Sequence, residues 1–362
     1  MAPFRVALSG DFLRTDGTPA YPMFDLSPLA NTPDLEFAYV NPLDGVMQAD
    51  DLADFDALTL LAPRFDERSI GSNNRLAIVA RFGVGYDNVD VEACTAAGIA
   101  LVITPDGVRR PVAVAVLTFI LALAGKLLTK DRLTREGPAG WARRSAHMGM
   151  GLTGRTLGQL GIGNIGAEVL RLAAPLGMRF IAHDTFVSAE QARALSVELV
   201  DIETLFREAD FLSISVPLND DTRGLVGKRL IGLMKPTAYL INTARGPIVD
   251  QAALTEALEA GEIAGAGLDV FEAEPTPVDE RLLALENVIV TPHALCWTDE
   301  CFAGNGAADV RAVLEVRHGR EPAGVVNKAV LSDSRFRARL ASLAAGSRTF
   351  QEIASPSSSV SP

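Results

Sequence analysis

Three side chains of complementary chemistry each follow an apolar, strand-like segment in the second half of the sequence. They are Arg245, Glu274 and His293, which come after segments ending near residues 242, 268 and 290. An arginine is a permanent, fork-shaped cation that can hold a carboxylate and polarise a carbonyl. A histidine can give or take one proton near neutral pH, and a neighbouring carboxylate fixes its orientation. Together these residue types suit the interconversion of a 2-keto acid and a 2-hydroxy acid.

Position separates His293 from the other histidines. The remaining three lie in a polar segment, beside an acidic residue and in a charged late helix (His147, His183 and His318). A single histidine at a strand end is more often a structural cap than a catalytic group. The presence of Arg245 and Glu274 at equivalent strand ends reverses that balance. We therefore predict that Arg245, Glu274 and His293 are catalytic.

A glycine-rich turn near the middle of the chain predicts a dinucleotide site. The stretch 158–166 reads Gly-Gln-Leu-Gly-Ile-Gly-Asn-Ile-Gly, between a strand-like and a helical segment. Gly161 permits the tight turn, Gly163 lets backbone approach a pyrophosphate, and Gly166 lets the helix pack closely. Asp184, at the end of the next predicted strand, would accept hydrogen bonds from the adenosine ribose. Three close glycines also occur in plain turns, but the strand, helix and acid together favour the cofactor site.

Two Rossmann-like α/β domains are expected to position these residues, with an active-site cleft between them. Alternating strands and helical segments predict a flavodoxin-like substrate domain made of residues 1–104 and 300–335. Residues 105–299 predict a doubly wound, dinucleotide-binding domain. In such a sheet the ligands lie at the carboxyl ends of the strands. Residues 345–362 are low in apolar content and are expected to be a disordered tail.

A long apolar helix is predicted at 112–130, after the Thr-Pro-Asp-Gly cluster at 104–107. Its longest apolar run is too short for a bilayer, which predicts a buried helix. It is apolar on nearly all sides, and a polar, irregular arm with Trp141, Met148 and Met150 is expected to follow at 131–153. We predict that this helix and arm form a homodimer interface; the alternative is a helix sandwiched between two domains of one chain.

The composition of the chain limits which kinds of binding partner are expected. The chain has 362 residues, 33 basic and 45 acidic, with a net charge of −12, so nucleic acid is not an expected partner. The three cysteines lack metal-site spacing, which predicts no metal and favours a reducing compartment. The N-terminus lacks the pattern of a signal peptide. We expect a cytoplasmic protein that acts on a small molecule, with no membrane partner.

These stretches together resemble the D-isomer-specific 2-hydroxyacid dehydrogenase family, over nearly the whole chain up to about residue 331. The matching segments are 81–91, 152–166 with Asp184, 215–218 with Thr222, 241–246 with 249–250, 268–275 and 291–293. The resemblance implies NAD as the cofactor and supports the catalytic roles of Arg245, Glu274 and His293. It implies cofactor contacts from Gly161, Gly163, Asn164, Ile165, Gly166, Asp184, Val216, Pro217, Thr222, Thr243, Ala244, Asp269 and His293, with Asp269 near the carboxamide.

The resemblance also implies that the backbone amides of Val84 and Gly85 hold the substrate carboxylate. From spacing alone, the glycine-rich stretch at 81–90 is equally well a plain turn. Arg64, after the third strand of the first domain, is our choice for contacting the distal end of the substrate. Arg245 completes the predicted substrate contacts.

Two departures from the family pattern affect the substrate more than the reaction. Leu295 and Trp297 follow His293 where small residues are usual, so their bulk is expected to reshape the pocket. Val114 stands where a glutamate is common. An NAD(H)-sensing regulatory protein like the C-terminal binding proteins shares the fold and stays an alternative to an enzyme. A short-chain reductase is excluded because no tyrosine has a lysine four residues on. A glutamine at position 274 would indicate formate dehydrogenase, and this chain has a glutamate.

Overall fold

The computed structural model describes residues 3–72 and 75–354. The chain divides into two compact units, one made of Met1–Val108 and Asp299–Pro362 and the other of Arg109–Thr298. The sequence placed these boundaries at 104/105 and 299/300. The first boundary differs because helix α4 (Pro105–Gly125) begins in the first unit and continues into the second.

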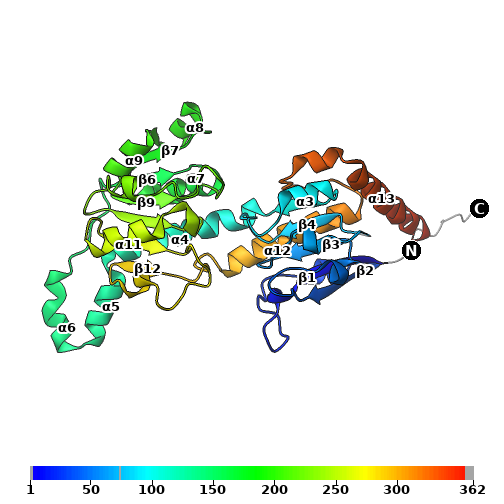
Figure 1. Ribbon diagram of the computed structural model, residues 1–362, viewed down its shortest axis with the longest axis horizontal. Helices are drawn as coiled ribbons and strands as arrows, with labels where there is room; N and C mark the ends of the chain where they lie inside the picture. The colour runs from blue at the N-terminus through cyan, green and yellow to red at the C-terminus, as the bar shows by residue number, and fades with distance from the viewer. Residues whose placement is uncertain (1–2, 73–74, 355–362) are drawn as a thin grey trace, which may run out of the picture. The chain divides into compact units, whose positions relative to one another are not determined.

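The first unit contains a five-stranded parallel sheet in the order β2-β1-β3-β4-β5 (Figure 1). The predicted strands are all present, and their bounds are β1 (Phe4–Ser9), β2 (Leu35–Val40), β3 (Ala57–Leu60), β4 (Ile78–Arg81) and β5 (Ala100–Ile103). Three of the central strands are buried along nearly their full length, as parallel strands covered on both faces must be. The helices are α1 (Ser27–Ala30), α2 (Ala49–Leu52), α3 (Val91–Ala96), α12 (Asp299–Arg317) and α13 (Ser334–Ala354).

The second unit contains a seven-stranded parallel sheet in the order β12-β11-β10-β9-β6-β7-β8. Its strands are β6 (Thr156–Leu160), β7 (Arg179–His183), β8 (Glu198–Leu199), β9 (Phe211–Ile214), β10 (Tyr239–Asn242), β11 (Gly265–Leu268) and β12 (Val288–Val290). The chain starts in the interior at β6, proceeds outward through β7 and β8, and then crosses to β9 on the other side of β6. The reversal between β6 and β9 is the position where doubly wound sheets bind ligands. The prediction of two Rossmann-like α/β folds is confirmed.

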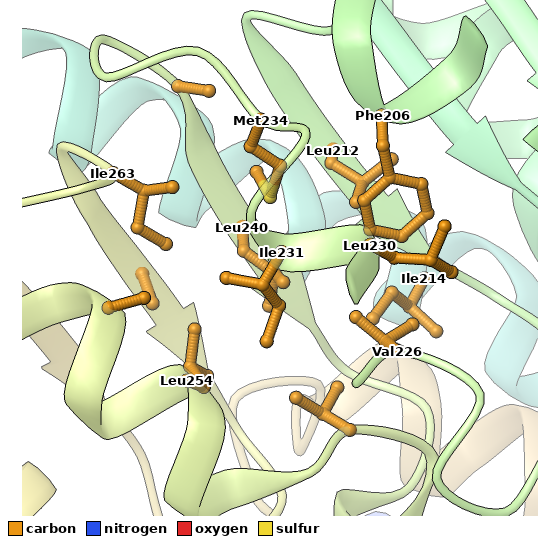
Figure 2. Packing of buried hydrophobic residues seen from close by; sticks show 14 of the residues in the cluster. Phe206, Leu212, Ile214, Val226, Leu230, Ile231, Met234, Leu240, Leu254 and Ile263 are labelled. Carbon is orange, nitrogen blue, oxygen red and sulfur yellow. The ribbon is translucent and has the colours of Figure 1, made fainter. Parts of the chain in front are cut away.

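Helices cover both faces of this second sheet. The helices of this unit are α4, α5 (Leu127–Arg135), α6 (Pro138–Arg143), α7 (Asn164–Ala173), α8 (Ala189–Ala194), α9 (Ile202–Glu208), α10 (Lys228–Ile231) and α11 (Gln251–Glu259), of which α5 and α6 lie away from the sheet (Figure 1). Strand side chains alternate between two apolar clusters, with Leu212 and Leu240 on one face and Phe211 and Ile241 on the other. Figure 2 shows the first cluster, where side chains of α9 and α10 pack on β9 and β10. The two cores hold the strand ends in place.

The segment from 105 to 146 differs from its prediction. Helix α4 includes Pro111 instead of starting after it, and it ends at Lys126, which has a left-handed φ of 52°. The predicted irregular arm is largely helical, because α5 and α6 pack against each other and project from the unit (Figure 1). By length and composition alone α4 is apolar enough to cross a membrane. However, 61% of its most apolar window is buried in the protein, as in a core helix.

The C-terminal segment is more ordered than predicted. Helix α13 extends to Ala354, so the expected tail begins at least ten residues later than the predicted 345. Within α13, Phe336 is fully buried and Leu340 nearly so. One face of this helix is therefore part of the core of the first unit. The rest of the predicted tail, 355–362, lies outside the described residues.

Candidate active site at the carboxyl edge of the second sheet

Five neighbouring parallel strands of the second unit end beside predicted site residues. β6 leads to Gly161, β9 to Val216, β10 to Arg245, β11 to Asp269 and β12 to His293. Parallel strands place their carboxyl ends at one edge of a sheet. The structure therefore brings these positions to a common edge.

Each of the three glycines in the turn after β6 is required for a different steric reason. Gly161 has a φ of +85°, and a Cβ there would lie 2.8 Å from the Val216 side chain. A Cβ on Gly166 would collide with the Gly161 carbonyl oxygen, so this glycine lets α7 pack against the turn. A Cβ on Gly163 would meet no atom within 4 Å. Open space at Gly163, directly before the N-terminus of α7, fits the close approach of a pyrophosphate.

Asp184 has a structural role that the sequence did not indicate. Its Oδ2 accepts a hydrogen bond from the Ile162 amide at 2.9 Å. Its Oδ1 accepts from the amides of Phe186 and Val187 at 2.8 and 3.1 Å. The carboxylate therefore ties the glycine turn to the loop after β7 and is held in a fixed orientation there.

Glu274 and His293 are in direct contact. The Nδ1 atom of His293 lies 2.8 Å from Oε2 of Glu274, and the Phe271 amide donates to Oε1 at 2.9 Å. Partial burial alone would raise the pKa of Glu274. The hydrogen bond with His293, the Phe271 amide and the charges of His293 and Arg245 outweigh it and lower the pKa. Glu274 is thus held as a carboxylate that accepts a hydrogen bond from Nδ1 of His293.

Asp269 anchors the loop that carries His293. Its buried carboxylate accepts the Thr291 hydroxyl at 2.6 Å and the amides of Ala294 and Leu295 at 3.0 and 3.2 Å. Burial raises the pKa of Asp269, and these three donors oppose that rise. His293 has a left-handed φ of 53°, which costs a non-glycine residue energy and needs such support. The sequence analysis placed Asp269 near the cofactor and missed this anchoring.

Arg245 is half-buried in an extended conformation at the end of β10. Its Nη1 donates to the Ala244 carbonyl at 2.7 Å. The Asn242 side chain donates to the Arg245 carbonyl at 2.9 Å and accepts from the Ala244 amide at 3.0 Å. Asn242, which sequence reasoning did not single out, thus shapes the turn that presents the guanidinium.

The other predicted cofactor residues lie in the loops of the same edge. The Thr222 hydroxyl donates to the Pro217 carbonyl at 2.6 Å, which closes the loop after β9. Thr243 and Ala244 directly follow β10, and Asn164 and Ile165 form the first turn of α7. Their placement agrees with a lining around the glycine turn, where the Val216 side chain lies 2.8 Å from the position that a Cβ on Gly161 would take.

The predicted substrate residues Arg64, Val84 and Gly85 belong to the first unit. Arg64 is exposed, and its main chain pairs with the segment around Val46. Val84 and Gly85 follow Gly83, which has a φ of +125°. Among the described residues, neither the Val84 nor the Gly85 amide has a hydrogen-bond acceptor. Two adjacent unpaired amides are the arrangement that binds a carboxylate.

The three residues that depart from the family pattern, Leu295, Trp297 and Val114, differ in how far they are buried. Leu295 packs against the core of the second unit, so its bulk is directed into the protein. Trp297 is 46% exposed and Val114 is 44% exposed. Of the two bulky residues after His293, Trp297 is therefore the one available to a ligand. Across the described residues, no group of three or more metal-ligating side chains gathers.

Comparisons with known proteins agree on one family. A family profile described as the NAD binding domain of D-isomer specific 2-hydroxyacid dehydrogenases matches residues 117–294. A glyoxylate reductase from Korarchaeum cryptofilum is 40% identical over 280 residues, covering 77% of this chain and 84% of that protein. A glyoxylate reductase from Thermococcus gammatolerans is 40% identical over 285 residues, with the same coverage. The crystal structure of D-mandelate dehydrogenase from Rhodotorula graminis superposes with a TM-score of 0.76 at 28% identity, covering 90% of this chain and 98% of that one. The chain belongs to the D-isomer specific 2-hydroxyacid dehydrogenase family and is an NAD-dependent enzyme of that family.

Proposed function

We propose that the chain interconverts a small 2-keto acid and the corresponding D-2-hydroxy acid, with Arg245, Glu274 and His293 as its catalytic residues. The observation that carries this proposal is the 2.8 Å contact between His293 Nδ1 and Glu274 Oε2. It lies at the same sheet edge as the glycine turn of the NAD-binding domain. A histidine oriented by a carboxylate is the arrangement that general acid–base catalysis requires.

The two ring nitrogens of His293 have different tasks in this proposal. Glu274 accepts from Nδ1, which leaves Nε2 to give a proton to the substrate oxygen in reduction and to take it back in oxidation. Arg245 binds the substrate and polarises its carbonyl, because a guanidinium donates two parallel hydrogen bonds. A bound NAD would supply the hydride chemistry at the substrate carbon that carries this oxygen. These steps together balance one hydride and one proton per turnover.

The substrate carboxylate is assigned to the amides of Val84 and Gly85, whose lack of acceptors among the described residues supports it. Arg64 is assigned to the distal end of the substrate, since its side chain is exposed in a neighbouring loop of the same unit. Several relatives carry the name glyoxylate reductase, which favours a small 2-keto acid. Trp297 is the exposed bulky group that would limit substrate size.

The cofactor contacts are assigned to the glycine turn and the strand ends beside it. Gly163 and the N-terminus of α7 receive the pyrophosphate, and Asp184 receives the adenosine ribose. The remaining contacts are assigned to Gly161, Asn164, Ile165, Gly166, Val216, Pro217, Thr222, Thr243, Ala244, Asp269 and His293. An acid at Asp184 repels a 2′-phosphate, and Thr185 and Phe186 offer no compensating cation.

A homodimer built on α4, α5 and α6 is also part of the proposal. Exposed apolar side chains on these helices and on the segment after them support it: Val114, Leu121, Leu127, Leu128, Trp141 and Met148. An exposed apolar surface of this kind usually marks an interface. Light scattering at micromolar concentration tests it, because a mass near the 38.4 kDa of one chain would contradict a dimer. A Trp141→Ala variant that still dimerises would show that α6 does not hold the interface.

We also propose a cytoplasmic location, which is supported by cysteines 94, 296 and 301 forming no disulfide among the described residues.

The function is tested by NADH oxidation with a panel of 2-keto acids that includes glyoxylate, hydroxypyruvate, pyruvate and phenylpyruvate. We expect stereospecific formation of a D-2-hydroxy acid from at least one of them. Tight NADH binding without turnover on any member would instead favour the NAD(H)-sensing alternative.

A further inference from the structure

The loop from Phe82 to Gly85 is fixed by hydrogen bonds to buried groups that have no part in the proposed reaction. Gly83 donates its amide hydrogen to Oγ1 of Thr104 at 2.8 Å, and the Thr104 amide donates to the Gly83 carbonyl at 2.9 Å. The Thr104 hydroxyl in turn donates to Oδ1 of Asn305 at 2.8 Å. Thr104 and Asn305 are 1% and 3% exposed. A buried hydrogen-bonded line therefore runs from α12 to the backbone of the loop.

A buried carboxyl group lies on the next turn of α12. Asp309 lies four residues after Asn305, is fully buried, and has no hydrogen-bond partner for either oxygen among the described residues. Helix α12 packs against β4, whose last residue is Arg81. Burial raises the pKa of the Asp309 carboxyl well above its usual range, and the charge of Arg81 opposes that rise.

The Arg81 guanidinium contacts the loop directly. Its Nη1 donates to the Phe82 carbonyl, and the same atom occupies the space that a Cβ on Gly83 would need. Gly83 has a φ of +125°, which only glycine adopts without strain. The guanidinium thus packs against Gly83, directly before the Val84 and Gly85 amides.

A buried carboxyl without hydrogen bonds costs stability, so folding alone does not account for Asp309. Asn305 and Asp309 occupy one face of α12 because residues four apart on a helix are neighbours. We propose that Asn305 and Asp309 are positioning residues, which act through Thr104 and Arg81 to fix the loop that presents the Val84 and Gly85 amides to the substrate carboxylate. This inference rests on the proposed function for the role of those amides.

The expected signature is weaker substrate binding without slower chemistry. An anion site made of two amides binds the ground state and the transition state alike, so its loss raises KM and leaves kcat nearly unchanged. With glyoxylate as the probe, we expect Thr104→Val to raise KM about tenfold, the scale of one buried hydrogen bond. Asp309→Asn should also raise KM, because it removes the acidic group that faces Arg81. Thr104→Ser keeps the hydroxyl and should restore the wild-type KM. NADH affinity should stay the same in all three.

The matched control is Asn327→Ala. Asn327 is a buried polar residue of the same unit, and it binds the Leu101 amide and the Ile99 carbonyl at 2.9 Å each, away from the loop. Its removal should lower the melting temperature and leave KM unchanged. Asp309→Asn should not lower the melting temperature at neutral pH, because a neutral amide costs less to bury than a carboxylate. A tenfold rise in KM for Asn327→Ala would mean that general loosening is enough, and would overturn the proposal.

Hydrogen exchange separates a failure of this inference from a failure of the proposed function. In the full chain without substrate, the amides of residues 82–85 should exchange faster in Thr104→Val and Asp309→Asn than in wild type and Asn327→Ala. Unchanged exchange there overturns the positioning role whether or not the wild type reduces glyoxylate. Faster exchange in a protein that reduces no keto acid would support the positioning role and reject the substrate assignment.

Discussion

Each unit carries a glycine loop directly after a strand, and the two loops are held in different ways. After β6, the turn passes at once into α7, and its shape depends on local contacts between Gly161, Gly166 and the first turn of the helix. After β4, the next helix begins only at Val91. That loop is held by side chains from β4, the end of β5 and α12. The first loop is shaped mostly by contacts within the turn itself, with Asp184 as an additional anchor, whereas the second depends on Asn305 and Thr104, which are distant in the chain.

The largest expected effect, on NADH binding and on stability, comes from a change in the turn after β6. Gly166→Ala should abolish NADH binding and destabilise the protein by about 2 kcal/mol or more, since its Cβ collides with the Gly161 carbonyl oxygen. Gly163→Ala is the matched control, because open space surrounds that position. It should keep the melting temperature of wild type and weaken NADH binding. Calorimetric titration and thermal unfolding measure both, and a Gly166→Ala variant with normal NADH affinity would contradict the steric account.

In the loop after β4, a glycine-to-alanine substitution should affect binding of the 2-keto acid and not of NADH. Gly83→Ala places a Cβ against the Arg81 guanidinium at a φ of +125°. We expect a rise in KM for the 2-keto acid of about tenfold or more, with unchanged NADH affinity. Steady-state kinetics with NADH titration decides it. Loss of NADH affinity in this variant would remove the functional distinction between the two loops.

Arg245→Ala should lower kcat with a 2-keto acid by about two orders of magnitude, because it removes carbonyl polarisation. Arg64→Ala is the comparison in the first unit, and its exposed side chain should affect only KM, by a few-fold. NADH should bind both variants as it binds wild type. Near-wild-type turnover by Arg245→Ala would remove that residue from the mechanism.

The wild-type enzyme should prefer NADH over NADPH by about tenfold or more in kcat/KM, because an Asp184 carboxylate at the proposed ribose contact would repel a 2′-phosphate. Since Asp184 also bonds three backbone amides, Asp184→Ala should relax this preference and lower NADH affinity together. Comparable kcat/KM for the two cofactors in wild type would contradict the assignment.

The smallest predicted effect concerns acid stability. The pKa of Glu274 is lowered from its ordinary value of 4.5, so its contact with His293 contributes stability that is fully present above that value. The contribution is lost as the pH falls through the lowered folded pKa. The difference in melting temperature between wild type and Glu274→Gln should therefore shrink between about pH 5 and about pH 3. A difference that grows on acidification would contradict the direction of this shift.

Site residues that depend on a local sequence pattern could be predicted, and those that depend on contacts in the folded chain could not. Gly161, Arg245 and His293 were identified from the sequence because each stands directly after an apolar strand, a local pattern. Asn242 and Asp269 were less visible, since their importance lies in hydrogen bonds within folded turns. Asn305 and Asp309 had no local signal, because Asn305 bonds Thr104 across 201 residues of sequence. The sequence pattern predicts the start of helix α4 at residue 112, because a proline usually marks a helix boundary. In the structure α4 begins at Pro105 and contains Pro111.

The most direct test of the account is His293→Gln, measured for NADH binding and for turnover of the 2-keto acid that wild type reduces best. Glutamine keeps a hydrogen-bonding side chain but cannot donate the proton from Nε2. We expect an unchanged dissociation constant for NADH and a fall in kcat of about two orders of magnitude or more. Turnover near that of wild type would show that His293 is not the proton donor and would contradict the proposed mechanism.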